Sequence, residues 1–155
     1  MIIRFRKNPL GERGEEVHAS SYIRKRQIVL DSALLDHSPE LIRIMVHEVF
    51  HFVWTRLDNR SRREWEGVVR GEFARRIPGE LGYSAALRKE RLMADGRGAI
   101  RNKLWRDYVC ESFCDTAAWC FSARTRHDEV DLPVVARKGR ERYFRSLLAR
   151  RILPV

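Results

Sequence analysis

The sequence contains few residues that cross-link a chain or interrupt its helices and strands, and it has no segment that could anchor it in a membrane. Of its 155 residues, only three are cysteine, five are proline and nine are glycine. The cysteines are odd in number and all lie within residues 110–120, which argues against a disulfide framework and predicts reduced thiols. No apolar run is long enough to span a membrane, and the first residues show no signal-peptide pattern. We therefore expect a cytoplasmic protein.

Length and composition indicate one globular unit. A chain of 18.3 kDa has the size of one domain, and no repeat or linker divides it, so we predict a single domain over residues 1–155. Hydrophobic residues (44%) and charged residues (34%) are balanced as in folded proteins. The net charge of +10 raises nucleic acid as a partner, but the basic residues are spread along the whole chain. Nucleic acid is therefore the less favoured partner, behind a peptide or protein.

Local patterns predict an α+β fold that is mostly helical, with a small antiparallel sheet. Short alternating stretches indicate three strands, at residues 2–6, 16–23 and 26–30. Capping residues, apolar spacing and glycine or proline breaks indicate four helices, at about 39–57, 61–77, 99–123 and 137–152.

The predicted helix at 39–57 is apolar on nearly all sides, yet it contains the H-E-x-x-H motif of His47, Glu48 and His51. Histidines four residues apart share one helical face and can bind a single zinc ion. Glu48 lies one position round from His47, where a carboxylate can take a proton from a metal-bound water. Buried polar side chains are costly unless they are satisfied, which a metal would achieve. The alternative is a set of ordinary core residues joined by hydrogen bonds.

A catalytic zinc needs a third protein ligand, and Glu111 is the best candidate. It lies in an apolar helical segment in which Glu111 and Asp115 share one face at i and i+4. We predict that Glu111 binds the zinc and that Asp115 accepts the far N–H of a ligating histidine. The alternative is a buried ion pair between these acids and Arg106 or Arg124.

Two cysteines in the same segment offer another ligand set. Cys110 or Cys114 could replace Glu111 as the third ligand, or could close the site as a structural zinc centre. Small apolar packing in a buried helix is the favoured interpretation of both, because the carboxylates would otherwise have no partner.

The two motifs together resemble those of the gluzincin clan of zinc metallopeptidases, to which thermolysin-like catalytic domains and the small minigluzincins belong. The resemblance implies a zincin-like active-site helix and a glutamate helix. It implies Zn²⁺ bound by His47, His51 and Glu111, with Glu48 as general base and Asp115 supporting a histidine. It also implies an endopeptidase-like hydrolase acting on a peptide or protein substrate.

The chain departs from the thermolysin-like pattern in the sixty residues that separate His51 from Glu111. The clan also supplies a side chain that holds the oxyanion, for which Tyr83, Tyr108 and His127 are candidates by residue type.

One further expectation concerns the substrate cleft of the clan. The strand at 26–30 is expected to be the edge strand above that cleft, where an extended peptide would bind. The alternative function is a non-catalytic zinc-binding regulator or sensor that keeps a peptidase-like fold and contacts nucleic acid or an acidic partner.

Overall fold

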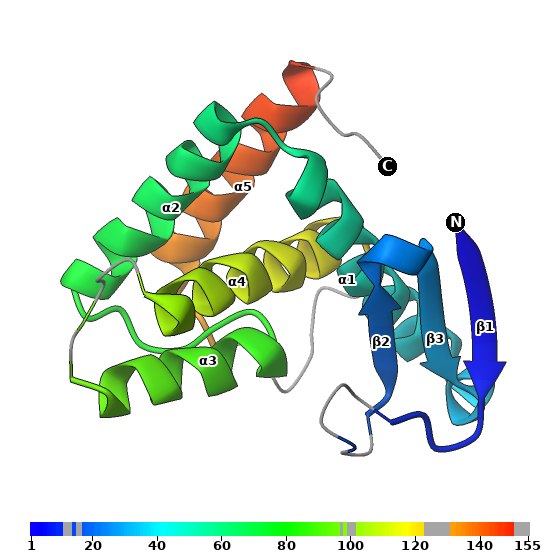
Figure 1. Ribbon diagram of the computed structural model, residues 1–155. Coiled ribbons are helices and arrows are strands. Elements are labelled where there is room, and N and C mark those ends of the chain that lie inside the picture. The colour runs from blue at the N-terminus through cyan, green and yellow to red at the C-terminus, as the bar shows by residue number, and fades with distance from the viewer. Residues whose placement is uncertain (11–13, 15–16, 97, 99–101, 123–130, 151–155) are drawn as a thin grey trace.

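A computed structural model describes all residues except 11–13, 15–16, 97, 99–101, 123–130 and 151–155 (Figure 1). The predicted α+β, mostly helical fold is confirmed. The strands are β1 (Ile2–Arg6), β2 (Ala19–Tyr22) and β3 (Gln27–Asp31), and the helices are α1 (Ser38–Arg56), α2 (Asn59–Ala74), α3 (Tyr83–Ala94), α4 (Lys103–Phe121) and α5 (Val134–Ala149). Two short 3-10 helices, η1 (Ile23–Lys25) and η2 (Ser32–Asp36), flank β3.

The sheet is mixed, so the prediction of an antiparallel sheet is wrong for one of its two strand pairs. β2 and β3 form an antiparallel hairpin, and β1 pairs with β3 in parallel, from Ile2 opposite Gln27 to Arg6 opposite Asp31. The strand order is β1-β3-β2. β3 is therefore the central strand, and the expectation that 26–30 forms the edge strand is wrong. The edge strand beside α1 is β2 (Figure 1).

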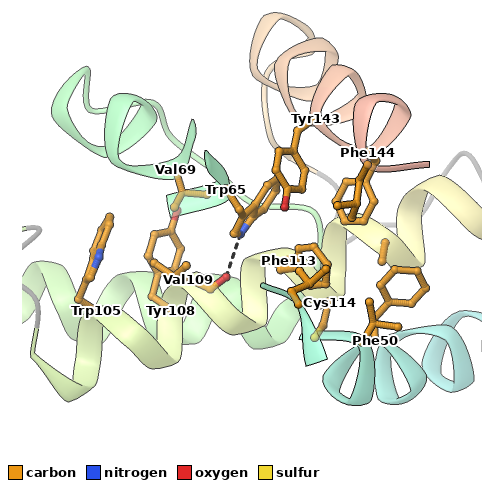
Figure 2. Close-up of a cluster of buried hydrophobic side chains, with 14 of the residues drawn as sticks. Phe50, Trp65, Val69, Trp105, Tyr108, Val109, Phe113, Cys114, Tyr143 and Phe144 are labelled. Carbon is orange, nitrogen blue, oxygen red and sulfur yellow. Dashed lines mark hydrogen bonds between the residues drawn. The ribbon is translucent and has the colours of Figure 1, made fainter. Parts of the chain in front are cut away.

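Antiparallel packing of α1 against α4 forms the centre of the helical part. Aromatic side chains from these two helices, α2 and α5 interlock there (Figure 2): the ring of Phe113 lies 5.0 Å from that of Phe144 and 5.8 Å from that of Phe50. Trp65 is fully buried and donates its indole N–H to the backbone oxygen of Val109, at 3.0 Å. Burial of these rings holds α1 and α4 in a fixed register.

The structure contains a helix that the sequence patterns did not predict. α3 lies along α4 (Figure 1) and buries Ala85, Lys89 and Leu92. Its first residue follows Gly82, which offers no capping side chain, and a lysine occupies one of its three buried positions. The ammonium of Lys89 is satisfied by the backbone oxygens of Ile77 and Gly79, at 2.8 and 2.7 Å. An amphipathic pattern with lysine on the buried face is hard to recognise in sequence.

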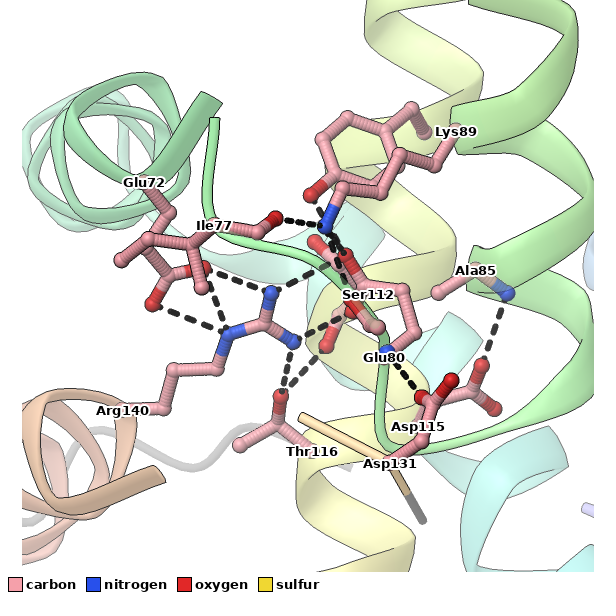
Figure 3. Close-up of polar contacts among 12 residues, drawn as sticks. Glu72, Ile77, Glu80, Ala85, Lys89, Ser112, Asp115, Thr116, Asp131 and Arg140 are labelled. Atoms are coloured by element: carbon pink, nitrogen blue, oxygen red, sulfur yellow. Dashed lines mark hydrogen bonds and ion pairs between the residues drawn. The ribbon is translucent and has the colours of Figure 1, made fainter. Parts of the chain in front are cut away.

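A buried ion-pair network attaches α5 to the rest of the fold (Figure 3). The Arg140 guanidinium is fully buried and contacts the carboxylates of Glu72 and Glu80, each at 2.7 Å. Tyr108 donates its hydroxyl hydrogen to Glu80 at 2.6 Å. The arginine thus joins α5 to α2 and to the segment before α3, and its charge is fully compensated.

Of the helices in the described part of the chain, none is long and apolar enough to cross a membrane.

Candidate metal centre

The two motif histidines converge near the middle of α1. Pro39 lies in the first turn of this helix, where its missing N–H costs nothing, and the helix runs unbroken through both histidines. The Nε2 atoms of His47 and His51 are 3.2 Å apart, and the two rings meet edge to face with centroids 4.9 Å apart. Both rings therefore present one nitrogen to the same point in space.

Glu111, on α4, faces that point from the opposite side. Its Oε2 atom lies 3.3 Å from Nε2 of His47 and 3.8 Å from Nε2 of His51. A tetrahedral zinc with ligands at about 2.0–2.1 Å separates its ligand atoms by about 3.3 Å. The three atoms thus form a triangle of the size that a zinc ion requires, and the donor set suits zinc.

Asp115 lies behind His47, one turn further along α4. Its Oδ1 is 2.7 Å from Nδ1 of His47, and its Oδ2 accepts the backbone N–H of Ala85 on α3 at 2.8 Å (Figure 3). Burial would lower the pKa of His47, but the carboxylates of Asp115, Glu111 and Glu48 together outweigh it and hold that pKa well above its ordinary value. Asp115 therefore orients the imidazole so that Nε2 faces Glu111.

The carboxyl group of Glu111 is strongly favoured as an anion. Burial would raise its pKa, but hydrogen bonding to His47 and the charges of both histidines and of Arg88 lower it to about 2. The pKa of His51 shifts upwards: burial lowers this pKa, but Cys110 and Glu111 outweigh burial and raise it to about 9. A divalent cation that displaced the imidazole protons would therefore meet an ionised carboxylate.

Two cysteines of α4, Cys110 and Cys114, lie next to the motif histidines, which simple packing in the core would not require. One nitrogen each from His47 and His51 and the Cys114 sulfur all lie within 4.8 Å of one another. Cys114 is fully buried and also packs in the aromatic core, and the Cys110 sulfur lies 3.6 Å from Nδ1 of His51. Cys114 is therefore a possible metal ligand as well as a core residue.

Glu48 is buried on α1 and is contacted by the edge strand. Ser21 of β2 places its Oγ 2.6 Å from Oε2 and 2.9 Å from the backbone oxygen of Glu48. The hydroxyl group donates to one carboxylate oxygen and leaves Oε1 for another partner. Ser21 was not predicted from the sequence, because the alternating faces of a short strand do not identify the partner of a side chain.

Arg88 is a second residue that the sequence analysis missed, because it lies on the unpredicted α3. Its Nη2 is 3.8 Å from Oε1 of Glu111. The predicted alternative, an ion pair of the acids with Arg106, is wrong: Arg106 is exposed, and its side chain pairs with none of the described carboxylates. Arg124 lies outside the described residues.

The three oxyanion candidates have different positions. Tyr108 is fully buried and its hydroxyl is bonded to Glu80, so it is wrong as a candidate. Tyr83 begins α3 next to Gly82, whose Cα packs against Asp115, and its side chain is 64% exposed. His127 lies outside the described residues.

No protein family, curated protein or solved structure matches this chain. The geometry of α1 and α4 is therefore the basis for a functional conclusion.

Proposed function

We propose that this protein is a zinc-dependent peptidase of the gluzincin type, with endopeptidase-like action on a peptide or protein substrate. The observation that supports this most strongly is the position of Glu111. Its carboxylate oxygen lies 3.3 and 3.8 Å from the two imidazole nitrogens of the H-E-x-x-H motif, although sixty residues separate the motifs. A partly buried carboxylate between two imidazoles, with a second carboxylate behind His47, suits a divalent cation.

Each polar residue of the site has a role in this proposal. His47, His51 and Glu111 hold the ion, and Asp115 accepts the Nδ1 hydrogen of His47. A zinc ion in such a site lowers the pKa of a water molecule towards neutrality and polarises a substrate carbonyl.

Glu48 performs the proton transfers in this proposal. Its carboxylate takes the proton of the attacking water and passes it to the leaving amine. The Ser21 hydroxyl lies 2.6 Å from Oε2 of Glu48, and its hydrogen bond would hold the carboxylate in place and leave Oε1 to take that proton. Ser21 is a positioning residue, since it acts through Glu48.

Metal content is the first test. We expect a single zinc ion per wild-type chain purified without chelator, and a clear loss in Glu111→Ala. Asp107→Ala is the matched control, because Asp107 is a carboxylate of the same helix and, among the described residues, it forms an ion pair with Lys103 alone, at the surface. Elemental analysis of the three proteins decides the result. Zinc retained in Glu111→Ala would contradict the role of Glu111 as a zinc ligand.

Activity is the second test. Glu48→Gln keeps the size of the side chain and removes its basicity, so we expect zinc binding to persist and peptide hydrolysis to fall by about 100-fold or more. A library of fluorogenic peptides provides the assay. A biological activity that survived this substitution would favour the zinc-binding regulator instead.

A second candidate function is a structural zinc site closed by Cys114. It is favoured by one observation, that the Cys114 sulfur lies within 4.8 Å of a nitrogen of each motif histidine. Cobalt substitution distinguishes the two, because a thiolate ligand produces an intense charge-transfer absorption that carboxylate and imidazole ligands lack. If that band appears and is lost in Cys114→Ser, the closed site is correct.

A further inference from the structure

A cavity of about 550 Å³ lies where the C-terminal part of α1 meets the N-terminal parts of α2 and α4. Two indoles, Trp54 and Trp105, line it, together with the side chains of Arg62, Arg63 and Arg106. A volume of this size is typical of sites for small organic molecules. None of its lining residues belongs to the metal centre.

The three arginines lack partners among the described residues. No carboxylate there pairs with Arg62, Arg63 or Arg106, and Nε of Arg62 is buried without a hydrogen-bond partner. A buried N–H with no acceptor is costly, and the guanidinium groups of these arginines have no described carboxylate as acceptor.

One carboxylate lines the cavity but does not cancel this charge. Glu66 accepts hydrogen bonds from Arg70 and from the Trp105 indole, each at 2.8 Å, so its charge is already compensated. The cavity therefore has an uncompensated positive charge from three guanidinium groups.

The N-termini of two helices add to the positive electrostatic potential of the cavity. Arg62 and Arg63 lie in the first turns of α2, and Arg106 lies in the first turn of α4, so the positive ends of two helix dipoles point to this region. The caps Asp58 and Asn102 already accept amide hydrogens of these helices, from Ser61 and Trp105. An anion would therefore be held by the guanidinium groups and not by the backbone amides.

We propose that this cavity binds a phosphate group, either free or as part of a small monoester. A guanidinium group offers parallel N–H donors that match phosphate oxygens, and three of them match a dianion better than a singly charged carboxylate. The cavity exceeds the size of phosphate alone, and the indoles provide an apolar surface for an attached organic group.

The phosphate cavity lies about one helical turn from the metal centre. Trp54 follows His51 by three residues on α1, and Arg106 precedes Cys110 by four residues on the antiparallel α4. Cys110 and His51 contact each other, so the cavity and the metal centre occupy successive turns of the same helix pair. Phosphate binding does not depend on peptidase activity, and the two proposals can fail separately.

The test is a titration of the full chain with ligand, monitored by NMR at constant ionic strength, with chloride as the balancing anion. Inorganic phosphate and adenosine monophosphate are the two ligands. We expect saturable shifts of the Trp54 and Trp105 indole N–H signals, and none for Trp119, which packs in a separate cluster. Tighter binding of the nucleotide identifies an organic monoester, and equal binding identifies free phosphate.

Three variants distinguish phosphate binding in this cavity from non-specific electrostatic attraction to the basic protein. Arg63→Gln and Arg106→Gln each remove an exposed guanidinium group and leave the core intact, and each is expected to weaken phosphate binding by about tenfold. Arg145→Gln is the matched control, because this exposed arginine lies on α5, away from the cavity. Shifts that do not saturate, or an equal loss in Arg145→Gln, would overturn the proposal.

Discussion

Replacing Asp115 by alanine tests the arrangement of the three helices around the metal centre. The Asp115 carboxylate is 2% exposed and accepts hydrogen bonds from Nδ1 of His47 and from the backbone N–H of Ala85. In Asp115→Ala both donors stay buried without an acceptor. Since each of the two donors costs about 1–3 kcal/mol, we expect the free energy of unfolding to fall by about 2–6 kcal/mol.

The measurement is equilibrium urea unfolding of the metal-free protein, in the presence of a chelator. Asp107→Ala is the control on the same helix: its ion pair with Lys103 is at the surface, so we expect a loss of about 0.5 kcal/mol or less. Asp115→Asn should give an intermediate loss, because the amide keeps one acceptor and turns a donor towards the other partner.

Zinc affinity provides a second readout of the same substitution. Loss of the carboxylate behind a ligating histidine typically weakens metal binding by about 10–100-fold, so a competition titration of Asp115→Ala should show a shift in that range. If Asp115→Ala were as stable as Asp107→Ala and bound zinc as tightly as wild type, both contacts of Asp115 would be absent in solution.

Three further predictions concern the surroundings of the site. Burial alone would raise the pKa of Glu80, but Arg140 lowers it, so this stabilisation is present above about pH 4.3 and lost below it; urea unfolding of Glu80→Gln should depend less on pH in that acidic range. Arg140→Met leaves Glu72 without its buried ion-pair partner and Glu80 with Lys89 alone, at 3.3 Å, and should destabilise the fold by about 3–5 kcal/mol in thermal unfolding, whereas an unchanged melting temperature would contradict the network. A Cβ at Gly82 would lie 2.5 Å from Cγ of Asp115, so Gly82→Ala should cost about 1–3 kcal/mol and weaken zinc binding; equal zinc affinity would refute this close approach.

The helices that the sequence predicted most clearly are those whose pattern lies within one continuous stretch of residues. α1 and α4 were predicted from apolar residues at helical spacing and from the capping residue or glycine break that precedes each helix. That spacing also predicted that Glu111 and Asp115 face the same side, and both contact His47. The metal-binding roles of these residues stay predictions until zinc is measured.

Features that depend on distant segments were missed. Strand order is set by which segments pair, so the positions of β2 at the edge and β3 in the centre have no local signature. The same holds for Ser21 beside Glu48 and for Arg88 beside Glu111, since each contact joins segments at least twenty residues apart. α3 was missed because Lys89 occupies a buried position that only its acceptors explain.

Residue spacing along the chain was enough to predict the two central helices and the residues that each presents on one face, because helical spacing is a property of consecutive residues. The packing of distant segments brings Glu111 to both imidazoles and places Asp115 behind His47 and against α3. This placement depends on the register of α1 against α4. The register is set by the interlocked rings of the core, and no pattern within either helix specifies it.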